Sequence, residues 1–491
     1  MTPSIEQHTN VAGSWVGSPI IFFADKPTER LIGEGVFPEH LNDDVLGRCL
    51  DALYDADVSM LYQVMAEKVV DKLGLKADSI HIDITSFHVD GQYATQDGDD
   101  TQHLQLVKGY SRDHRPELNQ VILELICENQ AGIPVYMQAL SGNTNDQKAF
   151  AEVTRSHIDC LKAAQQSRYF VGDAALYVAD SIHALSQQNQ LFISRVPMTL
   201  KAAKVLVSTL DESKLATIGD GYQGYWVDSD YAAVKQKWLV IRSEQAGKRE
   251  RLTLSKNLIK QSEKEQKQFR QLCKQRFACQ ADAHKALERF QCTLKLTQLH
   301  QTDCIAQPIY CGAGRPKKGQ QPDRMEYTLT GHIATSLAAV ELAKAQAGVF
   351  ILATNDCSEQ LSMQAMLDTY KSQQSVERGF RFLKSPDFLT ASLYLKKPER
   401  IEALLMVMTC SLMIYAALEH QIRKNLKEKN QFFMDMKNKP GQKPTARWVF
   451  QRFIGISEAR LGSSPPVLTD IKAHHKVIID VMGERYRKIY S

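Results

Sequence analysis

Two carboxylates lie where apolar strands are expected. Asp83 lies within the alternating segment 79–89 (SIHIDITSFHV), and Asp173 follows Gly172 at the end of the apolar run RYFVG. An acid in a strand is costly to bury unless it is paired or bound to a metal. Two such acids and a third on a later helix can hold two metal ions about 4 Å apart, which stabilise the attacking and leaving oxygens of a phosphodiester. Hard oxygen ligands favour Mg²⁺ or Mn²⁺.

The third acid is expected on a single helix over residues 361–384. A seven-residue spacing places Tyr370, Glu377 and Lys384 on one face, and Gln373 and Arg381 fall in the same stripe. A separate apolar stripe is expected to face the core, formed by Val376, Phe380 and Leu383. A carboxylate beside an aromatic ring and cations is typical of a surface that grips phosphate. For this segment alone, an ordinary solvated helix face is an equal alternative.

The elements that must position these acids follow from the change of period along the chain. Segments 42–57 and 58–74 have apolar residues at helical spacing, with a start signal at Asn42 and a stop at Gly74. These two helices are compatible with a DNA-binding helix-turn-helix and also with any small helical domain. Strand-like runs follow at 79–89, 121–129, 133–140, 168–172 and 191–197, with a helix before each of the last two. This order predicts an α/β fold, a mixed sheet flanked by helices.

Residues 201–345 interrupt that pattern. Two exposed strands are predicted at 221–231 and 234–244, before a long basic helical stretch and a loop rich in Gly, Pro and Lys. The apolar run 347–355 then resumes the sheet. We therefore predict an N-terminal helical DNA-binding domain over 1–76 and a C-terminal region over 426–491. Between them we predict a catalytic domain in two parts, 77–200 and 346–425, which are separated by an insertion over 201–345.

Charge is unevenly distributed over the 491 residues. The formal net charge is only +4, yet residues 235–320 carry about 19 Lys and Arg against about seven acids, as phosphate-backbone binding requires. A solvated helix surface explains the same block equally well.

The 10 cysteines are scattered without a C-x-x-C pair, which argues against a zinc site and for a reducing compartment. No secretory signal is seen at the N-terminus, and the apolar run Ala403–Leu418 is interpreted as a buried core helix rather than a membrane span.

Three segments together resemble the acidic motifs of a known family. HIDITSFH, YFVGDAAL and YKSQQSVERGFRFLKSP are similar to those of DDE transposases from bacterial insertion sequences, which have a ribonuclease-H-like core. In one branch, the YREK-signature branch, the last motif reads Tyr, two residues, Arg, three residues, Glu, six residues, Lys. This chain matches at Tyr370, Glu377 and Lys384 but has Gln373 at the arginine position, and Arg378 or Arg381 is a candidate for the missing charge. The resemblance covers about residues 15–420.

The resemblance implies a cut-and-paste reaction with two Mg²⁺ or Mn²⁺ ions held by Asp83, Asp173 and Glu377. The implied partners are double-stranded DNA, as terminal inverted repeats and target, and a second copy of the chain. The implied location is the cytoplasm, at the nucleoid. The same branch carries a strand-rich insertion in which an aromatic ring can stack on a flipped base. Trp226 and Trp238 lie in that region, and buried packing is the favoured alternative for each.

Other features carry weaker expectations. GRPKKG, with Arg315, Lys317 and Lys318, resembles a minor-groove hook, although a plain basic loop is as good an interpretation. His81 and His88 beside the first acid are expected to be structural partners rather than metal ligands. Two further function classes stay open: a non-catalytic DNA-binding regulator derived from a transposase, and a generic metal nuclease with the same core.

Overall fold

The structure is a computed structural model that describes most of the chain. The described residues are 22–24, 26–76, 78–89, 104–110, 115–145, 149–152, 167–311, 320–384, 392–393, 395–459, 462 and 467–491. Two compact units emerge: the first comprises Met1–Ser194, Ala232–Val234 and Met366–Ser491, and the second comprises Arg195–Tyr231 and Lys235–Ala365. The five-part division predicted from the sequence stays a prediction.

The first unit begins with the helices expected near the N-terminus. After α2 (Thr28–Leu31) and the 3-10 turn η3 (Pro38–His40), α3 (Asp43–Asp55) is capped by the Asn42 side chain, which accepts from the Val45 amide. α4 (Val58–Leu73) ends at Gly74, whose φ of 63° suits glycine. Both start and stop signals are therefore confirmed.

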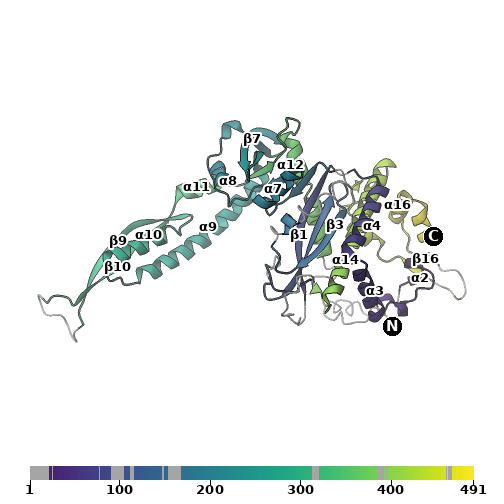
Figure 1. The fold of residues 1–491 in the computed structure, drawn as a ribbon, viewed down its shortest axis with the longest axis horizontal. Helices are drawn as coiled ribbons and strands as arrows, with labels where there is room; N and C mark the ends of the chain where they lie inside the picture. The colour runs from purple at the N-terminus through teal and green to yellow at the C-terminus, as the bar shows by residue number, and fades with distance from the viewer. Residues whose placement is uncertain are drawn as a thin grey trace. The chain divides into compact units, whose positions relative to one another are not determined.

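These N-terminal helices pack on the rest of the first unit. The buried Tyr62 hydroxyl donates to the Pro134 carbonyl oxygen at 2.7 Å, and Arg400 donates to both carboxylate oxygens of Asp51 at 2.7 Å each. Figure 1 shows α4 and α14 beside the strand β3, and α3 next to α14. Much of the buried surface of α4 therefore covers the sheet.

The sheet of this unit has the strand order β3-β2-β1-β4-β5. Its strands are β1 (Ser79–Val89), β2 (Asn119–Glu128), β3 (Pro134–Ser141), β4 (Tyr169–Gly172) and β5 (Leu191–Arg195). The first three form the predicted antiparallel meander, whereas β1, β4 and β5 run parallel. Helix α7 (Ala179–Gln187) precedes β5, and β12 (Ser392–Leu393) pairs with the end of β1. The predicted mixed α/β sheet is confirmed.

Helices from late in the sequence cover this sheet. We predicted one helix over 361–384, but the chain forms α12 (Met363–Lys371) and α13 (Gln374–Leu383), with a turn at Ser372 and Gln373. α14 (Pro398–Glu428) follows. Among the described residues it is the helix that is long and apolar enough to cross a membrane, but half of its most apolar 18-residue stretch is buried within the protein. It contacts α3, α4 and β3, in agreement with a core helix.

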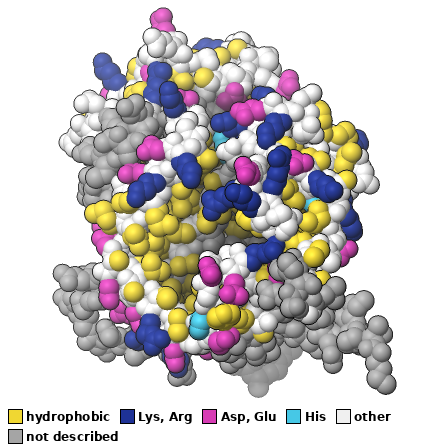
Figure 2. Space-filling view, turned by 90° about the vertical axis from the view of Figure 1, so that its right-hand side faces the viewer, with side chains coloured by type: hydrophobic (Ala, Val, Ile, Leu, Met, Phe, Trp, Pro, Cys, Tyr) yellow, Lys and Arg dark blue, Asp and Glu magenta, His cyan; other side chains and the backbone are white. Residues whose placement is uncertain are grey.

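The end of the chain forms a small cluster on α14. Its elements are β13 (Phe433–Met434), β14 (Pro440–Gly441), α15 (Ala446–Phe453), β15 (Ser457–Ala459), β16 (Val467–Thr469), α16 (Ala473–Met482) and α17 (Glu484–Ile489). Its core includes Leu426, Phe433 and Val449. Figure 2 views this side and shows hydrophobic side chains gathered around a hollow, with Lys and Arg side chains nearby.

The second unit contains a sheet portion and a helical hairpin arm. The strand order is β11-β8-β7-β6, with these bounds: β6 (Ala216–Gly219), β7 (Tyr222–Tyr231), β8 (Val234–Ser243) and β11 (Val349–Thr354). Both predicted strands of the insertion form, but β8 is largely buried because β11 pairs along it. The expectation that it is exposed is wrong. Short helices α8 (Lys201–Ser208), η4 (Glu212–Lys214) and α11 (Leu337–Gln346) complete this part.

The arm replaces the single basic helix expected from the sequence. Two helices, α9 (Glu244–Cys273) and α10 (Gln280–Gln291), run along a two-stranded antiparallel ribbon of β9 (Thr297–Ile309) and β10 (Arg324–Thr335) (Figure 1). Glu265 of α9 is buried and accepts hydrogen bonds from the Gln261 side chain and from the hydroxyl of Thr297 on β9. The basic loop with Arg315, Lys317 and Lys318 lies outside the described residues.

Candidate active site

Asp83 breaks the burial of its strand. Every residue of β1 from Ser79 to Val89 is buried except Asp83, which is partly exposed. Its Oδ1 accepts a hydrogen bond from the Ile84 amide at 2.8 Å. Its partial exposure leaves the Asp83 carboxylate accessible in a strand whose other residues are buried, as a metal ligand would have to be.

Asp173 directly follows β4, the strand that neighbours β1. β1 and β4 pair in parallel, with Ile80 opposite Phe170 and His81 opposite Val171. Continued two residues past its last backbone pair, this register would bring Asp83 level with Asp173. Residues opposite each other in adjacent strands point to the same face, about 4.8 Å apart in the backbone. This register therefore predicts that both carboxylates share one face of the sheet.

The exit from β4 holds Asp173 in place. Its Oδ1 accepts from the Ala175 amide at 2.8 Å, and its backbone oxygen accepts from the Ser194 hydroxyl at 2.8 Å. A side chain at Gly172 would meet Leu176 at 2.8 Å and Ile82 at 3.3 Å. The glycine before the acid is thus required mainly by the close packing of Leu176, with Ile82 of β1 as a second near contact.

Two contacts fix the segment that bears Glu377 along the same strand. Ser372 Oγ lies 2.9 Å from His81 Nε2, and the Lys384 ammonium lies 5.6 Å from the centre of the Phe87 ring. Twelve helical residues span about 18 Å, and six strand residues about 20 Å, so the segment runs alongside β1. Glu377 then lies about level with Asp83.

The third carboxylate differs from the other two in exposure. Glu377 lies in the first turn of α13 and is exposed, whereas Val376, Phe380 and Leu383 are buried as predicted. Among the described residues, no three His, Cys, Asp or Glu side chains are arranged so that they could hold a metal ion. The oxygen donors suit Mg²⁺ or Mn²⁺, but Glu377 is not gathered with the two aspartates into a three-ligand site.

His81 is a buried structural partner, as expected. Burial lowers its pKa from 6.5 to about 3, so the ring is neutral at pH 7. Its Nε2 lies within hydrogen-bonding distance of Ser79 Oγ (3.1 Å) and Ser372 Oγ. Sequence reasoning missed Ser372, because only the helix break directs its hydroxyl to β1. His88 is also buried.

The predicted phosphate-gripping stripe is only partly exposed. Gln373 lies in the turn before α13, and only 6% of its surface is exposed. Its buried side chain offers no phosphate contact here. The prediction that Gln373 lies on the exposed face of a single helix is therefore wrong. Arg378 and Arg381 are exposed, and Tyr370 and Lys384 are half-buried. The two arginines are therefore the cations of this helix that solvent reaches freely.

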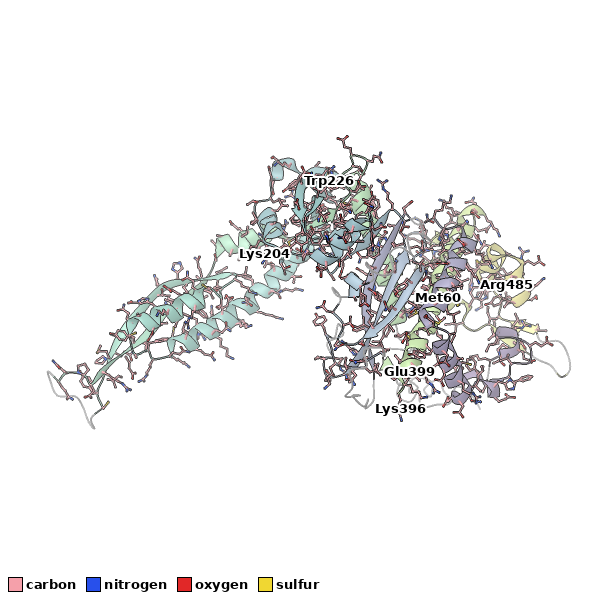
Figure 3. The ribbon with its side chains drawn as sticks, viewed as in Figure 1. Met60, Lys204, Trp226, Lys396, Glu399 and Arg485 are labelled. Atoms are coloured by element: carbon pink, nitrogen blue, oxygen red, sulfur yellow. The ribbon has the colours of Figure 1, made fainter. Side chains whose placement is uncertain are left out.

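The two tryptophans of the insertion differ in burial. Trp238, on β8, is 3% exposed and its indole nitrogen donates to Gln236 at 3.4 Å, so packing is its role here. Stacking on a flipped base, our other interpretation of Trp238, is wrong for this conformation. Trp226, on β7, is partly exposed, and stacking on a base stays a prediction for it (Figure 3).

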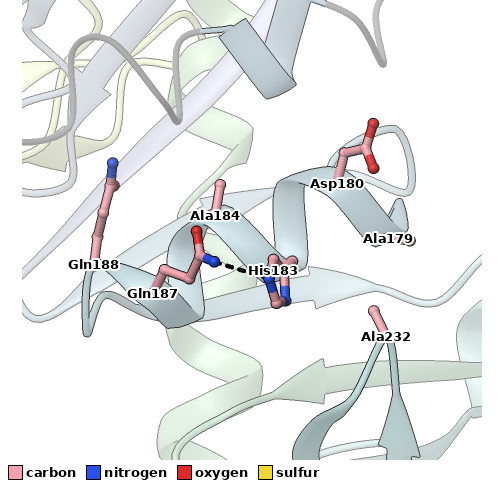
Figure 4. Close-up of a pocket in the computed structure, with 7 residues that line it drawn as sticks. All are labelled: Ala179, Asp180, His183, Ala184, Gln187, Gln188 and Ala232. Atoms are coloured by element: carbon pink, nitrogen blue, oxygen red, sulfur yellow. Dashed lines mark hydrogen bonds between the residues drawn. The ribbon is translucent and has the colours of Figure 1, made fainter.

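A separate pocket of about 470 Å³ runs along α7. Its lining includes Asp180, His183 and Gln187, and His183 Nε2 lies 2.9 Å from Gln187 Nε2 (Figure 4). None of the residues predicted for the site lines this pocket. It is therefore distinct from the face that carries Asp83 and Asp173.

Two protein-family models match this chain. The transposase DDE domain model matches residues 76–414, which include all three acids. The chain belongs to the DDE transposase family. A second model, described as a domain of unknown function (DUF4277), matches residues 20–67 of this transposase. No curated protein matches the chain.

Solved transposase structures are distantly similar to this transposase. A piggyBac transposase synaptic complex with hairpin DNA matches at 9% identity and a TM-score of 0.34, over 85% of this chain and 58% of that chain. A Mos1 transposase paired-end complex with the left transposon end matches at 12% identity and 0.16, over 26% and 38%. A Mos1 mariner paired-end complex with Mn matches at 14% identity and 0.16, over 30% and 45%. This transposase thus spans little more than half of the piggyBac chain that it matches.

Proposed function

We propose that this transposase cleaves DNA at the ends of a bacterial insertion sequence and joins them to a target by a cut-and-paste route. One observation carries the proposal: β1, which bears Asp83, pairs in parallel with β4, which Asp173 directly follows. The Ser372 contact to His81 adds that the Glu377 segment is held alongside β1. This arrangement supports the assignment of the three acids to one site. The YREK-signature branch is part of the proposal, with Gln373 as its departure.

The residues of this chain divide the work as follows. Asp83, Asp173 and Glu377 would hold two Mg²⁺ or Mn²⁺ ions, which supply charge stabilisation to the attacking and leaving oxygens when bound. Because Glu377 lies on the exposed start of α13, its carboxylate would have to turn toward the aspartates when cations and DNA bind. Arg378 and Arg381 are suited to neutralise phosphates beside it.

The partners follow from the reaction. We propose double-stranded DNA as terminal inverted repeats and as target, and a homodimer that pairs two element ends, in the cytoplasm at the nucleoid. The basic face of α9 and the loop with Arg315, Lys317 and Lys318 are proposed as additional DNA contacts in the second unit. The partly exposed Trp226 is proposed to stack on an unpaired base.

A non-catalytic DNA-binding regulator is the second candidate. It is favoured by the finding that, within the described residues, no three potential ligands are arranged to hold a metal ion, and by the burial of Gln373. Both candidates share the same surface for DNA and differ in whether the acids act.

A cleavage assay separates the two candidates. Purified transposase is incubated with a labelled duplex that carries an element end, with Mg²⁺, Mn²⁺ or EDTA. We expect metal-dependent nicks at the end, and Asp83→Asn, Asp173→Asn and Glu377→Gln should each reduce the rate by a factor on the order of 10⁴. Duplex binding without cleavage in either metal supports the regulator instead. Cleavage that survives all three substitutions contradicts the assignment of the site.

A further inference from the structure

A groove lined by cations runs along α14 in the first unit, and we propose that it binds the phosphate backbone of a DNA strand. Two cavities of about 390 and 600 Å³ form it, and they adjoin because Ala131 and Glu419 line both. The inference rests on the proposed function, since it assigns a further contact to the same DNA. No residue of the three-acid site lines either cavity.

The groove collects cations from three separate segments. They are Arg378 and Arg381 on α13, Lys424 and Lys427 on α14, and Lys443 and Arg447 around the start of α15, and all six are exposed. Lys424 and Lys427 form no ion pair within the described part of the chain. Exposed cations that gather from three segments raise the local positive potential, which attracts a polyanion such as a DNA strand.

The one acid among the lining residues is already neutralised. Glu419 accepts from Arg423 at 2.6 Å and from the Ala446 amide at 2.8 Å. Arg423 also donates to the Pro444 carbonyl oxygen at 2.9 Å, so this pair fastens the loop before α15 to α14. Glu419 and Arg423 thus shape the groove, and the six exposed cations give it its charge.

The dimensions and the floor fit a strand of nucleic acid. From Tyr415 to Lys427, α14 rises about 18 Å, which corresponds to about five nucleotide steps of 3.4 Å. At one end, the Phe382 and Tyr415 rings lie 4.0 Å apart and form an apolar floor. The Arg447 amide donates to the Tyr415 hydroxyl, so the first amides of α15 are occupied and side chains must bind the anion.

The groove also begins next to the proposed active site. Arg378 follows Glu377 directly, and Arg381 lies one turn further along α13. A strand held by Lys424 and Lys427 at the far end would therefore lead toward the acids. Through Lys424, Lys427, Lys443 and Arg447, the groove extends the DNA path by contacts that the acidic motifs do not include.

Salt-dependent DNA binding tests the inference. Fluorescence anisotropy with a labelled duplex and a labelled single strand is measured from low to high KCl for the full chain. In Lys424→Gln/Lys427→Gln we expect affinity to fall on the order of tenfold, and the slope of log K against log salt to become shallower by about 1.8 on a duplex, or about 1.4 on a single strand. The matched control is Lys201→Gln/Lys204→Gln, two exposed lysines on α8 with the same three-residue spacing, which should leave the slope unchanged.

The outcomes separate this inference from the proposed function. If the wild type cleaves element ends but the Lys424/Lys427 variant keeps the full slope and affinity, the groove does not bind DNA and the inference is overturned. If the slope changes as expected but the wild type never cleaves, the groove stands and the enzyme proposal fails. Competition by polyglutamate as strong as that by duplex would assign the groove to an acidic protein and also overturn the inference. Circular dichroism of each variant confirms that it is folded.

Discussion

Ser372 Oγ lies 2.9 Å from His81 Nε2, across 291 residues of sequence. This contact joins the turn between α12 and α13 to the strand that carries Asp83. It fixes where α13 begins along β1, and therefore how far Glu377 lies from the two aspartates.

Ser372→Ala tests whether the contact with His81 positions Glu377. Loss of the hydroxyl removes one partner of a buried ring and is expected to lower the unfolding free energy by about 1–3 kcal/mol. Because α13 would be held less firmly, we expect the cleavage rate at saturating DNA to fall about tenfold while DNA affinity is unchanged. The control is Ser372→Thr, which keeps a hydroxyl and should restore most of the rate. An unchanged rate in a folded Ser372→Ala protein would show that the contact does not position Glu377.

Divalent cations should stabilise the folded wild type through the acids. Mg²⁺ or Mn²⁺ at 100 times its Kd adds about 2.7 kcal/mol, which appears as a higher Tm in thermal denaturation. In Asp83→Asn this increase should be much smaller, because one of the three proposed carboxylate ligands is lost. A Glu419→Gln variant is the control, since that carboxylate is already paired with Arg423. Equal shifts in wild type and Asp83→Asn would argue that the ions bind elsewhere.

The two tryptophans should respond in opposite ways. Trp238→Ala leaves a cavity around a buried ring and should cost about 3–5 kcal/mol of stability, measured by chemical denaturation. Trp226→Ala should leave stability within about 0.5 kcal/mol but reduce processing of an element end with an unpaired base. A loss of stability in Trp226→Ala comparable with that in Trp238→Ala would mean that both rings only pack.

The N-terminal helices should be inseparable from the catalytic unit. Deletion of residues 1–76 removes Tyr62, Ala66 and Val70, which cover β3 and α14, so we expect the remaining chain to be insoluble or to bind a hydrophobic dye. Tyr62→Phe is the milder test. It leaves the Pro134 carbonyl oxygen without its donor and should lower the unfolding free energy by about 1–2 kcal/mol. A truncated protein that folds with native stability would instead support an independent domain.

The sequence alone determined the elements whose signals are local. Alternating apolar residues identified β1 with Asp83 inside it, the Asn42 and Gly74 signals bounded α3 and α4, and Gly172 marked the end of β4 before Asp173. These features depend on residues within a few positions of one another, because backbone period, capping and turn conformation are set by near neighbours.

Only the tertiary structure decided which residues of those elements are exposed and adjacent. The turn at Ser372 and Gln373 divides a segment whose period continues as one helix, because a hydrogen bond to the distant His81 is formed there. β8 and Trp238 are buried since β11 pairs beside them, more than 100 residues later in the chain. The groove along α14 likewise exists because Arg378, Lys424 and Lys443 meet only after folding. Burial and proximity are sums over contacts far apart in sequence, and no local pattern contains them.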